Sequence, residues 1–152
     1  MSGIMMMLVG TGGGGRATAT YTYSANTANA SLNITSLAGY SAGSTDVTIT
    51  VNSGVYLYST STGNAGLTLT GGSTGDTITL VNNGYIMGQG GKGGTNDVGL
   101  IGGTALSLGF NTTINNTNAS AYIGGGGGGG GATYTTDRKS TRLNSSHIPL
   151  SR

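Results

Sequence analysis

Few residues in this chain of 152 amino acids have side chains that support catalysis. The sequence contains no cysteine and no glutamate, and its one histidine is His147. General acid–base catalysis needs groups held within hydrogen-bonding reach, but Asp46, Asp76 and Asp97 each lie beside glycine, threonine or asparagine, a context typical of turns and strand starts. The sequence therefore predicts that the protein is not an enzyme and that it has no cofactor and no metal site.

Glycine patterns around Lys92 spell nucleotide-binding motifs without the context that these motifs require. Gly88, Gly90 and Gly93 satisfy the GxGxxG pattern, but a dinucleotide site also needs a helix directly after the glycines and an acidic residue about twenty residues on. A phosphate-binding P-loop is excluded because Lys92 is followed by Gly93 instead of serine or threonine. We therefore expect no nucleotide site.

Two other patterns partly match known binding motifs. Residues 90–97 partly match a calcium-binding nonapeptide repeat, but Thr95 stands where an acid is expected, and the interpretation of Asn96 and Asp97 as a turn is favoured. Threonines two residues apart resemble the ranked threonines of insect ice-binding β-helices. Because any half-exposed strand favours threonine on its wet face, ice binding is only a distant alternative. The pairs are Thr18/Thr20, Thr48/Thr50, Thr68/Thr70 and Thr77/Thr79.

Alternating apolar and polar residues predict an all-β fold of short repeated strands. Residues 17–24 alternate at period two, and Val47, Ile49 and Val51 share one face of a strand over 46–51. After a turn at 52–54, residues 55–58 are predicted to be the partner strand of 46–51. Further strands are predicted at 67–70, 77–81, 100–108 and 112–114, and no segment predicts a helix.

The predicted strands recur at intervals of about ten residues, which is typical of a β-sandwich, barrel or coil. Residues 51–54 resemble residues 81–84, and this spacing of thirty indicates an internal repeat. Two copies do not decide between a β-coil and a sandwich-like arrangement.

Composition divides the chain into four regions. Residues 1–16 are apolar and glycine-rich, 17–81 form the β-strand region, 82–136 are a glycine-rich repeat region, and 137–152 form a tail of different composition. The apolar run at 4–9 is too short to span a membrane and lacks the flanks of a signal peptide, so it is expected to be a buried strand or an assembly surface, without membrane insertion.

The tail at 137–152 holds most of the positive charge, the only histidine and the only proline. Residues 137–147 back-translate into a widely used sequencing adapter read in frame, so we interpret the tail as non-native and expect the natural protein to continue beyond Thr136. The alternative is a genuine basic tail that binds an anionic partner. Without the tail no basic patch remains, and nucleic acid is not an expected partner.

Two segments run from a Tyr-Ile pair into glycine, at residues 76–94 and 121–131. They are similar to glycine-rich bacteriophage tail and tail-fibre tip proteins, in particular adhesins of the T-even-like type. The resemblance implies a virion structural protein of the tail, located outside the cell, that is a tip protein or adhesin recognising a bacterial surface receptor, either protein or glycan. Other tail or fibre subunits are implied partners, and a homo-oligomer is an open alternative. A non-viral glycine-rich surface or matrix protein is the other interpretation.

The resemblance also implies that the glycine segments pack as polyglycine II helices, although the residues alone leave flexible and packed segments both open. The implied structural glycines are Gly88, Gly90, Gly91, Gly93, Gly94, Gly124, Gly127 and Gly131. The predicted receptor-binding residues are Tyr85, Met87, Gln89, Lys92, Asn96, Asp97 and Tyr122. If the segments pack, Gly127→Val, and more mildly Gly91→Ala, should destabilise the fold or abolish receptor binding.

Overall fold

The structure, a computed structural model, describes residues 15–94 and 98–131. In these residues the chain forms three sheets of parallel strands and a single short 3-10 helix, η1 (Ile34–Ser36). Sheet A has the order β1 (Ala17–Tyr23), β4 (Thr45–Val51), β7 (Thr77–Asn82) and β10 (Thr113–Asn115). Sheet B has the order β11 (Tyr122–Gly124), β8 (Tyr85–Met87), β5 (Tyr56–Tyr58) and β2 (Thr27–Ala28). Sheet C has the order β3 (Ala30–Asn33), β6 (Leu67–Thr70) and β9 (Leu106–Leu108).

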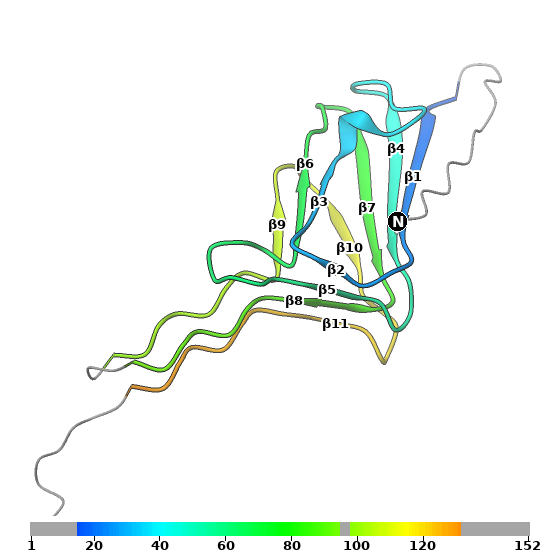
Figure 1. Ribbon diagram of the computed structural model, residues 1–152. Helices are drawn as coiled ribbons and strands as arrows, with labels where there is room; N and C mark the ends of the chain where they lie inside the picture. Colours follow the sequence, from blue (N-terminus) through cyan, green and yellow to red (C-terminus); the bar gives the residue numbers. More distant parts are fainter. Residues whose placement is uncertain (1–14, 95–97, 132–152) are drawn as a thin grey trace, which may run out of the picture.

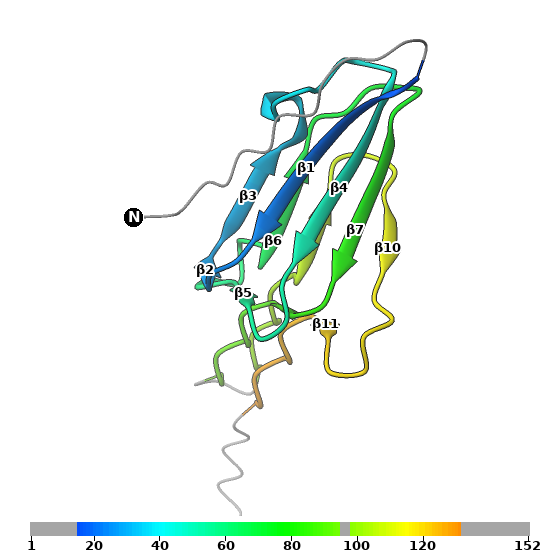
Figure 2. The same ribbon diagram turned by 90° about the vertical axis from the view of Figure 1, so that its right-hand side faces the viewer.

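Consecutive strands enter sheets A, B and C in turn, so that each set of three makes one coil of a β-solenoid. In Figure 1 sheets A and C stand upright and sheet B crosses their base, and Figure 2 shows the strands of sheet A side by side. Neighbouring coils pair in parallel, and Thr48 pairs with Thr20 below and Thr79 above. The all-β prediction is confirmed, and of the two arrangements left open the structure has the coil. Each sheet has strands on both sides of the compositional boundary at residue 81.

The predicted pairing of 46–51 with 55–58 is wrong. The strands themselves form, as β4 and β5, but they belong to different sheets, and β4 pairs with β1 and β7. The turn between them, with Val55 N–H donating to the Asn52 carbonyl at 3.1 Å and Gly54 at a φ of 76°, turns the corner from sheet A to sheet B. A hairpin would need the second strand to return beside the first.

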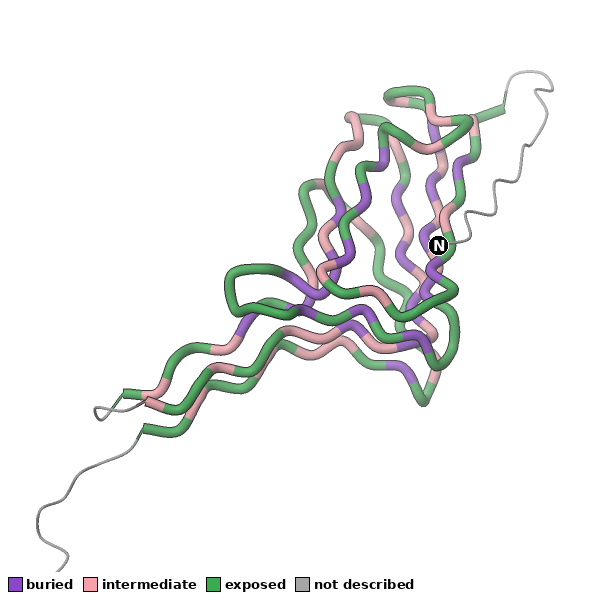
Figure 3. The backbone as a smooth tube through the Cα atoms, viewed as in Figure 1, coloured by how far each residue is buried: buried purple, intermediate pink, exposed green. Residues whose placement is uncertain are grey.

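The core lies between the three sheets, and its strand residues come from β1 and from β3 to β8. Figure 3 shows the buried positions along these strands. Val47, Ile49 and Val51 are all buried, as the alternation predicts. Register places apolar residues of successive coils above one another, for example Ile49 beside Leu80 and Leu57 beside Ile86. Burial of each such side chain contributes about 1.5–3 kcal/mol, and the stacking repeats this gain in the coils up to β8.

One predicted strand is much shorter than expected. Of residues 100–108 only β9 is a strand, because the preceding residues 98–103 leave the solenoid and pack against other glycine-rich segments. The apolar run at 4–9 lies outside the described residues.

Candidate functional site

Three glycine-rich segments project together from the solenoid, and we call them the glycine bundle: residues 88–94, 98–103 and 124–131. Figure 1 shows them extending side by side away from sheet B. Two of them continue directly from paired strands, since β8 ends at Met87 and β11 at Gly124. The sheet therefore fixes where the bundle starts.

Backbone hydrogen bonds join the three segments in a cycle, at intervals of three residues. Gly88, Gly91 and Gly94 donate to the carbonyls of Gly124, Gly127 and Gly130 at 2.8–3.0 Å. The third segment donates to the second, from Gly126 to Gly103 and from Gly129 to Leu100, both at 2.8 Å. The second donates to the first, from Gly103 to Gln89 at 2.6 Å and from Leu100 to Lys92 at 3.0 Å. The first and third segments are thus in parallel contact, and the second runs in the opposite direction.

The inner positions of the bundle are glycines at every third residue. A Cβ on Gly88, Gly91 or Gly94 would meet carbonyls of the second segment, from Gly103, Leu100 and Val98 respectively. The same holds around the cycle for Gly99 and Gly102, which face the third segment, and for Gly126 and Gly129, which face the first. Only glycine allows backbones to approach this closely, as at the axis of a collagen triple helix. The period of three is also that of a polyproline-II-type helix, and the polyglycine II conformation of the segments stays a prediction.

Of the other bundle glycines, Gly103 and Gly124 are crowded by Thr62 and by the Tyr122 ring, whereas several have open surroundings. A Cβ on Gly127 would have no heavy atom within 4 Å, and on Gly90 and Gly93 the nearest atoms would be carbonyl oxygens at 3.9 and 3.5 Å. The expected order of the two substitutions is therefore reversed, because Gly91 is an inner position and Gly127 an outer one. Gly124 and Gly131 lie at the two ends of the third segment. Gly99 and Gly102 are inner positions that the sequence interpretation missed, although their GxxG spacing was a usable signal.

Large apolar side chains project from the second segment of the bundle, residues 98–103. Val98 is 72% exposed, Leu100 57% and Ile101 83%. The sequence interpretation missed Leu100 and Ile101 as surface residues because it assigned 100–108 to one strand. The signal that could have identified these two residues is their place between Gly99 and Gly102.

The predicted receptor-binding residues divide into two groups. Gln89 and Lys92 are exposed on the first segment of the bundle, next to its inner glycines. Tyr85, Met87 and Tyr122 lie instead on the outer face of sheet B. Asn96 and Asp97 lie outside the described residues.

Tyrosines of successive coils form a strip along the outer face of sheet B. The rings of Tyr56 and Tyr85 stack with centroids 4.6 Å apart, and those of Tyr85 and Tyr122 meet edge to face at 5.8 Å. Tyr58 adds a further exposed ring beside Met87. We call Tyr56, Tyr58, Tyr85 and Tyr122 the tyrosine strip, and it lies where the bundle leaves the sheet.

The two described aspartates hold turns in place. Asp46 Oδ1 accepts a hydrogen bond from Arg16 Nε at 2.6 Å, and Arg16 Nη2 also donates to the carbonyl of Gly75 at 2.7 Å. Asp76 accepts hydrogen bonds from the Tyr40 hydroxyl at 2.6 Å and from the backbone N–H groups of Ser73 and Thr45 at 2.8 and 3.1 Å. The hydrogen bond from Tyr40, followed by those from the backbone, lowers the pKa of Asp76 below its ordinary value. These two carboxylates therefore stabilise the fold.

Other binding chemistry is sparse in the described part of the chain. Residues 15–94 and 98–131 contain no cluster of three or more His, Cys, Asp or Glu that could hold a metal ion. No helix there has the length and apolar character of a membrane span. Three of the threonine pairs lie on the outer face of sheet A, but register aligns only Thr20, Thr48 and Thr79 in one row. The pair Thr68/Thr70 lies on sheet C.

Comparison with known proteins identifies the family. Residues 18–144 match the family described as phage tail fibre adhesin Gp38. The match covers the solenoid and the bundle and extends into the segment 137–152, whose non-native origin stays a prediction. No curated protein and no solved structure matches the chain. The adhesin interpretation is thereby favoured over a matrix protein and over an ice-binding protein. The chain belongs to the phage tail fibre adhesin Gp38 family, and it is an extracellular component of the virion tail that attaches the phage to its host.

Proposed function

We propose that the glycine bundle is the part of this adhesin that contacts the bacterial receptor, and that Val98, Leu100 and Ile101 make the central contact. The observation that carries the proposal is the exposure of these three side chains on a projecting element. Contiguous exposed apolar surface is rare on soluble proteins and marks interaction sites. Gln89 and Lys92 supply polar contacts at the rim of this surface, where interfaces are usually polar.

The construction of the bundle favours this role. Its three segments are joined by backbone hydrogen bonds and close glycine contacts, so the side chains between the inner glycines have no core to fill. They are free to bind a partner, and a backbone already fixed by hydrogen bonds loses little conformational entropy on binding. The tyrosine strip at the base of the bundle offers a second contact, because exposed tyrosines supply large contact area at low entropic cost.

We further propose that attachment is the whole activity of the chain and that it does not catalyse a reaction. Asp46 and Asp76 are engaged in turn contacts with Arg16 and Tyr40, which supports this view. The solenoid then serves as the scaffold that holds the bundle, and other tail or fibre subunits contact its surface. Homo-oligomer formation stays a prediction.

The proposal is tested by retention of bacteria on beads that carry the full chain. With a panel of bacterial strains, the unmodified protein should retain at least one strain, and Ile101→Ser should reduce that retention at least tenfold, because a large exposed anchor is lost without any loss of packing. Ile114→Ser is the matched control, since Ile114 is also an exposed isoleucine but lies on β10, outside the bundle.

Retention of no strain by the unmodified protein would contradict the proposal. So would equal retention by the Ile101→Ser variant and the unmodified protein. A measured melting temperature for each variant separates lost contact from lost folding.

A further inference from the structure

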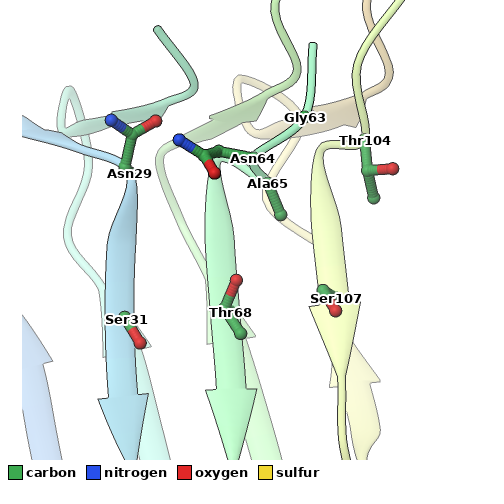
Figure 4. Close-up of a pocket in the computed structure, with 8 residues that line it drawn as sticks. All are labelled: Asn29, Ser31, Gly63, Asn64, Ala65, Thr68, Thr104 and Ser107. Carbon is green, nitrogen blue, oxygen red and sulfur yellow. The ribbon is translucent and has the colours of Figure 1, made fainter. Parts of the chain in front are cut away.

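Sheet C carries a hollow on its outer face, and none of its lining residues belongs to the glycine bundle. Its volume is about 420 Å³, and all of its lining residues are uncharged and non-aromatic. Figure 4 shows Ser31, Thr68 and Ser107 in one row across β3, β6 and β9, with Asn29, Asn64 and Thr104 where these strands begin. We refer to it as the sheet C hollow.

Register fixes the row of hydroxyl groups. Ser31 pairs with Thr68, and Thr68 pairs with Ser107. Neighbouring strands are about 4.8 Å apart, so three hydroxyls recur at that spacing on a rigid surface. The sheet therefore presents donors and acceptors that need no rearrangement before binding.

Most polar side chains of the hollow form no hydrogen bond within the described residues. Asn29 is held in place, since its amide nitrogen donates to Thr60 Oγ1 at 2.7 Å and its carbonyl oxygen accepts from Thr60 N–H at 3.0 Å. In residues 15–94 and 98–131, by contrast, the side chains of Ser31, Asn64, Thr68, Thr104 and Ser107 have no hydrogen-bond partner within the protein. Hydroxyl groups both donate and accept, and amides offer one group of each kind.

This lining selects one class of ligand. It has no charged residue to attract an anion or a cation, and it has no large apolar or aromatic side chain of the kind that anchors a protein partner. A ligand that matches many neutral donors and acceptors is itself neutral and rich in hydroxyl groups. We propose that the sheet C hollow binds an uncharged oligosaccharide segment of a bacterial surface glycan.

The site is separate from the proposed receptor contact of the bundle, and it does not depend on it. Each hydroxyl contact replaces hydrogen bonds to water by hydrogen bonds to sugar, so the net free energy gained per contact is small. A single site therefore binds the glycan weakly. Many copies acting together on one cell surface would raise the overall affinity. The sheet C hollow would then hold the phage at the surface while the bundle meets its receptor.

Ligand-observed saturation-transfer NMR on the full chain tests the proposal. The probes are neutral hexasaccharides of glucose, galactose, mannose and N-acetylglucosamine, with a sialic acid oligomer as the charged comparison. At least one neutral probe should receive saturation from the unmodified protein. Thr68→Val, which replaces one hydroxyl by a methyl group, should weaken that signal at least fivefold, and Ser107→Ala should weaken it as well.

Thr48→Val is the matched control, because Thr48 is a half-buried threonine on an interior strand of sheet A and does not line the hollow. It should leave the signal unchanged. The proposal is overturned if no neutral probe is bound, if Thr68→Val binds like the unmodified protein, if Thr48→Val loses the signal equally, or if only the charged probe is bound. Because no cells are used, these results do not depend on whether the bundle finds its receptor.

Discussion

Asp76 joins two turns of neighbouring coils through a single carboxylate. Its oxygens accept one hydrogen bond from the Tyr40 hydroxyl and two from the backbone N–H groups of Ser73 and Thr45. All three donors favour the ionised form, and the bond from Tyr40 is the largest cause of the lowered pKa. The folded state thus stabilises the ionised form of Asp76.

A pH titration of stability tests this role. Because the folded-state pKa of Asp76 lies below its ordinary value of 3.8, the contribution to stability is complete above that pH and is lost as the pH falls through the lower folded-state value. Asp76→Asn should therefore have a lower melting temperature than the unmodified protein at pH 7, and the difference should shrink below about pH 4. Thermal unfolding followed by circular dichroism from pH 7 to pH 2 measures it. A difference that stays constant over the whole range would contradict the assignment.

Elements of this protein obey two different rules of packing. In the strands an apolar side chain every second residue fills the core, whereas in the bundle a missing side chain every third residue brings backbones together. Replacing a glycine of the bundle should therefore destabilise the fold at an inner position but not at an outer one, although the two kinds of position look alike in sequence.

Gly91 and Gly127 give the sharpest contrast. Gly91→Ala should destabilise the bundle by about 1–3 kcal/mol, because its Cβ would overlap the Leu100 carbonyl and force the segments apart. Gly127→Ala should be tolerated or stabilise by about 0.4–1 kcal/mol, since there is open space and the unfolded chain becomes stiffer. Hydrogen exchange of the bundle amides measures both variants. Equal protection in the two would mean that the segments do not pack as described.

Strand positions could be predicted from the sequence, but strand partners could not. β6 lies at Leu67–Thr70 and β7 at Thr77–Asn82, close to the predicted 67–70 and 77–81. Alternation decides which face of a strand is buried, yet it carries no information on which strand lies beside it. The partner of β4 is set by a corner at residues 52–54 and by a repeat about thirty residues long, and a turn signal alone does not distinguish a corner from a hairpin. Similarly, composition predicted that the glycines are structurally important. Which of them has no room for a Cβ, Gly91 or Gly127, depends on three segments that are distant in sequence and meet only in the folded structure.

The whole molecule is a stack in which each coil contacts only its neighbours. Strands β4 to β8 are hydrogen-bonded on both sides, whereas β1, β2, β3, β9, β10 and β11 are at the edges of their sheets within the described residues. Stability in such repeat architectures is approximately a sum of coil and interface contributions, so the ends open before the middle.

Amide hydrogen exchange of the folded protein should show this order. We expect amides of the interior strands, β4 and β7 above all, to exchange at least tenfold more slowly than those of β1 and β10, which have one neighbouring strand each. Exchange followed by mass spectrometry of peptides resolves the four strands of sheet A. Uniform protection across them would indicate a single cooperative unit in place of a stack.

The in-register pairing of the coils also constrains how the gene can change in length. Adding or deleting a single codon within a strand would turn Val47, Ile49 and their counterparts outward, because side chains alternate with a period of two. Duplication of a complete coil preserves the inside and the outside of every strand, and it shifts the bundle along the solenoid axis by about 4.8 Å, the distance between neighbouring strands. Inherited changes in the reach of this adhesin should therefore come as whole coils.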